Sequence, residues 1–132
     1  MINSEFRLLC ESLGFYSSKY ILDYLKRFAG NENIKDRPID YWLKGKSNCV
    51  DPIPVDVERL FINLQSMQLE IVKRERDSLL QNKPISFKYV FKDPSKMWLL
   101  YPELEGLPVT FLNQIMIRLG ISLDYFENNE GA

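Results

Sequence analysis

Apolar residues in the first part of the chain recur every three or four residues, which is the spacing of one buried helix face. This pattern predicts three short helices over residues 3–13, 18–28 and 37–44. Gly14 and Gly45 follow the first and third of them, and glycine readily takes the left-handed conformation that ends a helix. The predicted inward positions are Phe6, Leu9, Cys10, Leu13, Ile21, Leu22, Leu25, Phe28, Ile39, Trp42 and Leu43.

Polar residues at the start of each predicted helix can accept hydrogen bonds from its first N–H groups. The expected caps are Asn3 or Ser4, Ser17 or Ser18, and Asp36, with Pro38 in the first turn of the third helix. Amphipathic helices in this order, with a polar turn between the second and the third, are typical of a helix-turn-helix unit.

A longer amphipathic pattern follows Pro54 and predicts a helix over residues 55–81. Its apolar positions alternate between steps of three and four residues, with Phe61 alongside: Val57, Leu60, Leu64, Met67 and Ile71. The first half of this helix should cover the core of the helix-turn-helix. Beyond Met67 the helix extends past a small domain, so its apolar face either stays in a core or contacts a second subunit.

Residues 85–91 alternate between apolar and polar side chains, which predicts a short strand. Because a single strand leaves its backbone groups unpaired, it should pair with its copy in a second subunit or with another extended segment. Two more helices are predicted over residues 94–100 and 109–119, and residues 127–132 are expected to fray.

The length and composition are those of one domain, or of a small domain with an appended piece. The chain has 132 residues, of which 45% are hydrophobic and 13% aromatic, enough to build a core. We divide it into a domain at 1–66 and a module at 67–132 that is expected to join two copies as a homodimer. No apolar run suits a signal peptide or a membrane span, so we expect a cytoplasmic protein without a membrane partner. Cys10 and Cys49 are expected to be free thiols.

The absence of histidine removes several kinds of chemistry at once. It leaves no Ser-His-Asp triad, no histidine proton shuttle and no histidine zinc ligand. The chain also lacks glycine-rich nucleotide loops and the EF-hand pattern, and its carboxylates are scattered. We therefore expect no enzymatic activity, no cofactor and no metal.

The net charge of −1 conceals an uneven distribution along the chain. Residues 1–50 hold eight Lys and Arg against six Asp and Glu, residues 51–92 hold seven against six, and residues 93–132 hold two against six. The front of the chain is therefore mildly basic and the back is acidic. Long-range attraction to phosphates would be weak.

Four motifs follow one another between residues 5 and 60: FRLL, SLGF, PIDYWLKGK and IPVDVERL. Together they resemble the Cro/XRE-type, lambda-repressor-like helix-turn-helix family. Trp42, Gly45 and Lys46 match the large residue, the glycine and the basic residue that close this family's recognition helix, whereas Leu43 replaces its acidic residue. The long fourth helix, the strand and the segment through Tyr101 and Pro102 are more specifically similar to the YdiL-like bacterial proteins of unknown function. The resemblance implies a mainly α protein, a lambda-repressor-like helix-turn-helix bundle with a long fourth helix, one short strand and a C-terminal helical extension.

Two features depart from the family pattern. Ile21 stands where family members usually carry a small residue at the crossing of the second and third helices. The turn between these two helices is also several residues longer than the family's turn, which changes how the third helix would dock.

The resemblance implies sequence-specific binding of double-stranded DNA by a bacterial or phage transcriptional regulator, with the third helix, residues 37–44, in the major groove. In that geometry Arg37, Asp40, Tyr41 and Lys44 face the base edges, and an arginine there can bond a guanine through two hydrogen bonds. The other DNA-binding candidates would meet phosphates from the second helix or from beside the third: Ser17, Ser18, Lys19, Lys35, Lys46 and Asn48.

The main alternative is a protein-interaction module that uses the same helices to bind a protein instead of DNA. An antitoxin-like protein or an inhibitor encoded by mobile DNA would be an example. The weak positive charge, the long turn and the acidic tail favour this alternative. The two functions differ in their dependence on salt, because binding to DNA phosphates weakens steeply as salt rises.

Overall fold

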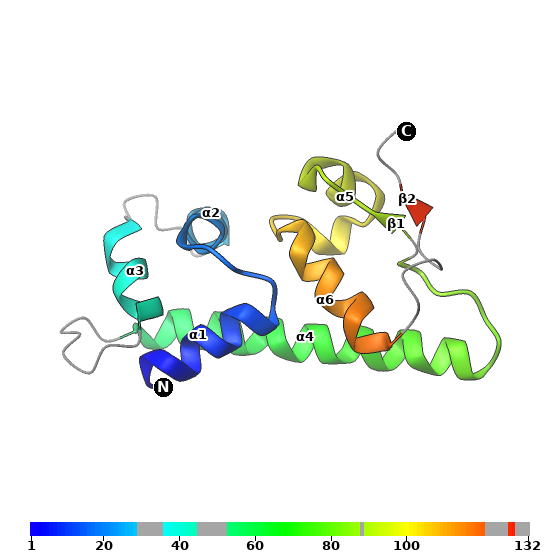
Figure 1. Ribbon diagram of the computed structural model, residues 1–132, viewed down its shortest axis with the longest axis horizontal. Coiled ribbons are helices and arrows are strands. Elements are labelled where there is room, and N and C mark those ends of the chain that lie inside the picture. The colour runs from blue at the N-terminus through cyan, green and yellow to red at the C-terminus, as the bar shows by residue number, and fades with distance from the viewer. Residues whose placement is uncertain (29–35, 45–52, 88, 121–126, 129–132) are drawn as a thin grey trace. The chain divides into compact units, whose positions relative to one another are not determined.

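The computed structural model describes residues 1–28, 36–44, 53–87, 89–120 and 127–128 (Figure 1). This part of the chain is mainly helical, as the hydrophobic pattern predicts. Its helices are α1 (Asn3–Ser12), α2 (Ser18–Phe28), α3 (Asp36–Lys44), α4 (Val55–Leu80), α5 (Pro94–Leu100), the 3-10 helix η1 (Pro102–Leu104) and α6 (Val109–Leu119). Two short strands complete the described elements, β1 (Tyr89–Val90) and β2 (Glu127–Asn128).

The chain forms two compact units, Met1–Gln65 and Ser66–Ala132. α4 supplies its first part to the first unit and its second part to the second. The division based on the sequence was placed one residue later, after residue 66. None of the helices in the described part of the chain is long and apolar enough to cross a membrane.

The core of the first unit is built around the ring of Phe61 on α4, which is fully buried. The ring centroid of Phe61 lies 5.4 Å from that of Phe6, 5.1 Å from that of Phe15 and 6.0 Å from that of Tyr24, all in edge-to-face geometry. Such aromatic pairs stabilise a core beyond the area that they bury. Phe61 thus joins α1, α2 and the segment between them to α4.

The start of α1 corrects one predicted cap. The N-cap position is Ile2, whose side chain makes no capping hydrogen bond, and Asn3 lies inside the helix. The side-chain amide of Asn3 instead donates a hydrogen bond of 3.0 Å to the backbone carbonyl of Tyr41 in α3. Asn3, a predicted cap of its own helix, therefore connects α1 to α3.

The end of α2 corrects an inward assignment. Phe28 is the last residue of the helix and is 46% exposed, although its spacing predicts burial. Its ring rests on Tyr24 at 4.7 Å between centroids, and Tyr24 takes the buried place beneath it. One face of the ring therefore remains open to solvent.

The buried face of α4 contains most of the predicted positions together with two polar residues. Leu60 and Met67 are only half-buried, whereas Gln68 and Glu75 are completely or almost completely buried. The most buried positions of the helix are Val57, Phe61, Leu64, Gln68, Ile71, Val72 and Glu75. The prediction is therefore confirmed at Val57, Phe61, Leu64 and Ile71, whereas the two polar residues are invisible to a search for apolar periodicity.

The predicted strand over residues 85–91 is shorter than expected. Among the described residues of this range only β1 forms a strand, and it pairs in parallel with β2, so that Tyr89 lies opposite Glu127. β2 belongs to the tail that was expected to fray. Ahead of β1, the backbone N–H of Ser86 bonds to the side chain of Glu75 at 2.8 Å and not to a neighbouring strand. The predicted alternation still appears in the burial of Ile85, Phe87 and Phe91.

The helices of the second unit begin and end as their sequence signals predict. Asp93 caps α5 by accepting a hydrogen bond of 2.9 Å from the backbone N–H of Ser95. α6 ends at Gly120, whose φ of 69° lies in the left-handed region. The apolar residues of this unit that are almost completely buried are Phe87, Met97, Leu104, Leu107, Phe111, Leu112, Ile115 and Met116.

Candidate nucleic-acid interface

α3 is held in the first unit by two buried side chains. Ile39 is fully buried and Trp42 is 3% exposed, and the ring of Trp42 meets that of Phe6 edge-on at 6.2 Å. α3 packs against both α1 and α2. In Figure 1, α2 is seen nearly along its axis while α3 runs across the view, so these two helices cross steeply. This order and crossing are compatible with a helix-turn-helix unit.

The described part of α3 offers little freely exposed surface. Asp40 and Tyr41, both predicted to face DNA bases, are half-buried, as are Pro38 and Leu43. None of the side chains described on α3 is fully exposed to solvent. A ligand that binds this helix would therefore meet partly accessible groups and the ends of the helix.

The other candidates on or beside α3 differ in how far the structure describes them. The backbones of Arg37 and Lys44 belong to α3, but their side chains lie outside the described set. Lys35, Lys46 and Asn48 fall outside the described residues altogether, as does Cys49. Their predicted roles remain predictions.

The start of α2 is accessible, as the DNA-binding hypothesis requires. Ser17 and Lys19 are exposed and Ser18 is half-buried. The hydroxyl of Ser17 accepts a hydrogen bond from the backbone N–H of Tyr20, but at a long 3.5 Å. A loosely capped helix start can offer N–H groups to an anion such as a phosphate.

The outer face of α2 carries residues that the sequence-based site did not include. Lys26 and Arg27 are exposed together with Lys19, and Asp23 is the acidic residue among them. Tyr20, on the same side, is 39% exposed. We call Lys19, Lys26 and Arg27 the α2 basic face; it lies opposite the buried Ile21 and Leu25. The helical positions of Ile21 and Leu25 point the opposite side of α2 outward, and this was the sequence signal that could have identified the α2 basic face.

The α2 basic face is positive but weakly so. It has three cationic side chains, with one carboxylate among them, over three helical turns. A cluster of this size can contact phosphates individually but creates only a small long-range field. It therefore suits a role in positioning a protein on a charged backbone.

Two observations on the described residues concern metal binding and thiol chemistry. No group of three or more His, Cys, Asp or Glu side chains among them could hold a metal ion. Cys10 is a free, buried thiol, and its burial raises its pKa well above that of an ordinary cysteine. A thiol that remains protonated at neutral pH is a poor nucleophile.

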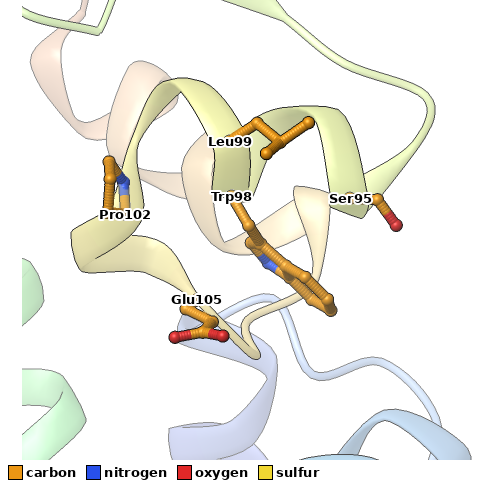
Figure 2. Close-up of a pocket in the computed structure, with 5 residues that line it drawn as sticks. All are labelled: Ser95, Trp98, Leu99, Pro102 and Glu105. Atoms are coloured by element: carbon orange, nitrogen blue, oxygen red, sulfur yellow. The ribbon is translucent and has the colours of Figure 1, made fainter.

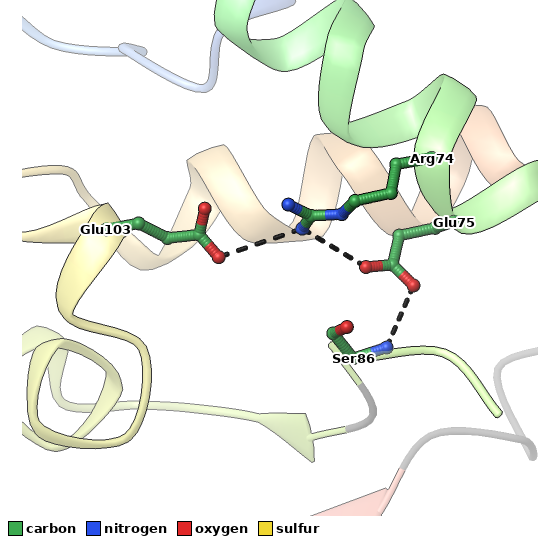
Figure 3. Close-up of polar contacts among 4 residues, drawn as sticks. All are labelled: Arg74, Glu75, Ser86 and Glu103. Carbon is green, nitrogen blue, oxygen red and sulfur yellow. Dashed lines mark hydrogen bonds and ion pairs between the residues drawn. The ribbon is translucent and has the colours of Figure 1, made fainter. Parts of the chain in front are cut away.

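The second unit contains a polar cluster that links three of its segments (Figure 3). A guanidinium nitrogen of Arg74 lies 3.2 Å from one carboxylate oxygen of Glu75 and 3.7 Å from a carboxylate oxygen of Glu103. The second oxygen of Glu75 accepts the hydrogen bond from Ser86, and the guanidinium lies 5.7 Å from the ring centre of Phe87. The cluster holds the segment after α4, and η1, against α4, so we assign it a structural role.

Comparisons of the chain with protein-family models, with curated proteins and with solved structures give no match. The function of the chain must therefore be inferred from the arrangement of its own residues.

Proposed function

We propose that the first unit binds double-stranded DNA in a sequence-specific way, as a transcriptional regulator does. The observation that carries the proposal is the steep crossing of α2 and α3, with α3 anchored by Ile39 and Trp42 while α2 presents a basic outer face. The resemblance of residues 5–60 to the lambda-repressor-like helix-turn-helix family supports the same conclusion.

In the proposed complex the two helices have different tasks. α3 enters the major groove, where Arg37 and Lys44 near its two ends reach base edges or phosphates and Asp40 and Tyr41 contribute their accessible atoms. α2 lies over the sugar-phosphate backbone, contacting it through Ser17, through Ser18 and through the α2 basic face. Backbone contacts would supply most of the affinity, and α3 would supply the sequence preference.

We propose further that the protein works as a homodimer, because a regulator of this type reads two half-sites about one DNA turn apart. The pairing of β1 with β2 in the same chain removes the strand as support for a dimer. Ile62 and Leu69, seven residues apart on α4, are 43% and 51% exposed and offer an apolar line to a second copy. Light scattering across a range of protein concentrations measures the subunit number directly.

The proposal is tested by DNA binding of the full chain and of two charge-matched double variants. Binding is followed by fluorescence anisotropy on a duplex selected by the protein from a random library. Arg37→Ala with Lys44→Ala should lower the affinity at least tenfold, since each lost charged contact costs about 1–3 kcal/mol. The control is Arg7→Ala with Arg59→Ala, which removes the same charge from exposed positions on α1 and α4.

Salt dependence supplies a second reading of the same experiment. If about four phosphates are contacted, affinity should fall by roughly a hundredfold between about 50 and 200 mM salt. The unchanged protein and the control double variant should share this slope. Equal losses in the two double variants, or retained affinity in the Arg37 and Lys44 variant, would contradict the role of α3.

The second candidate function, a protein-interaction module, is favoured by one specific observation. The first unit exposes three aromatic side chains, Tyr16, Tyr20 and Phe28, at 53%, 39% and 46%. Aromatic side chains are enriched in protein interfaces, and the half-buried Asp40 and Tyr41 on α3 suit a flat contact better than a groove. If this function is the correct one, duplex DNA will bind weakly and without sequence preference.

A further inference from the structure

The second unit has an open hollow of about 430 Å³ between α5 and η1, in a region to which the DNA-binding proposal assigns no role (Figure 2). Its lining consists of Ser95, Trp98, Leu99, Pro102 and Glu105. The indole, the leucine side chain and the proline ring make the walls apolar, while one hydroxyl and one carboxylate supply polar atoms. Apolar walls with a few placed polar groups are typical of binding sites.

The hollow is held in shape by hydrogen bonds at its base and edges. The indole N–H of Trp98 donates a hydrogen bond of 2.8 Å to the backbone carbonyl of Leu107, which fixes the position of the ring. The backbone N–H of Glu105 donates to the carbonyl of Pro102 at 3.2 Å, which closes the η1 turn. Because these groups are already ordered, a ligand would pay little entropy to organise them.

The rim of the hollow exposes apolar surface that a partner could cover. Leu99 is 84% exposed, which is high for a leucine in a folded unit. Trp98 is half-buried and Pro102 is exposed beside it. Tryptophan in a pocket is a frequent anchor of protein interfaces, and covering Leu99 would remove apolar surface from water.

The charge around the hollow selects the kind of partner. Residues 93–105 contain three acidic side chains and the single cationic residue Lys96. Asp93 caps α5 and Glu103 lies 3.7 Å from Arg74, so Glu105 is the carboxylate that lines the hollow. In Figure 2 the carboxylate of Glu105 and the indole of Trp98 project toward the same side of the α5–η1 turn. A carboxylate and an indole that line the same hollow favour a cation that can also pack on an aromatic ring.

We propose that this hollow binds an arginine side chain in a peptide segment of a partner protein. The aliphatic stem of the arginine packs on Trp98 and Leu99, and its guanidinium pairs with the carboxylate of Glu105. Apolar neighbours of that arginine cover the rim. The site lies within the second unit and does not depend on DNA binding by the first.

The test uses the full chain labelled with ¹⁵N and follows its two indole N–H signals by NMR. The Trp98 signal is identified by its loss in Trp98→Phe, and the Trp42 signal, from the core of the first unit, is the internal control. The probe is the acetylated and amidated tripeptide Leu-Arg-Leu, compared with Leu-Gln-Leu. The arginine peptide should shift the Trp98 signal saturably at millimolar concentration, and the glutamine peptide should bind about tenfold more weakly.

Variants at the rim separate the arginine contact from simple apolar adhesion. Glu105→Gln should remove the preference for arginine, and Leu99→Ser should weaken both peptides. The matched control is Leu100→Ser, a change on the same helix at a residue that is 45% exposed but does not line the hollow. Equal shifts from both peptides, no shift at millimolar concentration, or an unchanged preference in a folded Glu105→Gln protein would each overturn the proposal.

Discussion

Replacement of Phe61 by alanine should destabilise the first unit more than any neighbouring change on α4. Phe61 is fully buried and contacts three aromatic rings, from Phe6, Phe15 and Tyr24. Removing a buried phenylalanine ring costs about 3–5 kcal/mol through lost burial and the cavity that remains. Three edge-to-face pairs disappear with it, so we expect a value near the upper end of that range.

This loss is large compared with the stability that a unit of this size can have. At about 0.05–0.15 kcal/mol per residue, a unit of 65 residues is stable by roughly 3–10 kcal/mol. Phe61→Ala should therefore leave the first unit marginally folded or unfolded. Phe61→Leu keeps most of the volume and should cost about 1.5 kcal/mol or less in packing, plus the lost ring pairs.

The assay is urea unfolding followed by tryptophan fluorescence. In a Trp98→Phe background the remaining tryptophan is Trp42, whose ring contacts Phe6 and therefore reports on the core that Phe61 completes. With a slope of about 2 kcal/mol per M urea, a loss of about 4 kcal/mol lowers the midpoint by roughly 2 M. Val55→Ala, on the same helix at a side chain that is 66% exposed, is the matched control.

The outcome that would refute this reasoning is specific. If Phe61→Ala lowers the midpoint by no more than Val55→Ala does, the aromatic cluster is not the main source of stability in the first unit. A large loss in both variants would instead show that α4 itself is marginal and that any truncation on it is costly.

Three further predictions follow from single contacts. Glu75→Ala leaves the N–H of Ser86 without its acceptor and should lower the unfolding free energy of the second unit by about 1–3 kcal/mol. Unfolding is read from Trp98 fluorescence in urea. Glu75→Gln keeps an acceptor and should therefore lower the unfolding free energy by less. Asn3→Ala removes the side-chain bond to Tyr41 and should cost about 1 kcal/mol in thermal unfolding, with Ser4→Ala as a neutral control. Cys10 should resist a thiol reagent at pH 8 in the folded protein and react after unfolding, because burial raises its pKa. The raised pKa also means that the unfolded chain loses this proton first, so the free energy of unfolding should fall as the pH rises above the pKa of an unfolded cysteine, about 8.5. Rapid labelling of Cys10 without denaturant would contradict its burial.

Helix positions could be obtained from the sequence because their signals are local. The range 18–28 predicted for α2 and the range 109–119 predicted for α6 coincide with the structure, and Gly120 ends α6 in the left-handed conformation. Apolar spacing, caps and stop residues act within one or two turns of the backbone, so a single stretch of sequence contains all the information they need. The accessible start of α2 at Ser17 and Lys19 could be anticipated in the same way.

The partners of individual side chains were decided only by the tertiary structure. The side chain of Asn3 donates a hydrogen bond to α3 instead of capping its own helix. Glu75 lies on the buried line of α4, and Trp98 lines an open hollow instead of filling a core. In each case the deciding group is a backbone atom outside the residue's own helix, 38, 11 and 9 residues away: the carbonyl of Tyr41, the N–H of Ser86 and the carbonyl of Leu107. A buried polar group needs a hydrogen-bond partner wherever the fold supplies one, and local periodicity contains no information about that partner.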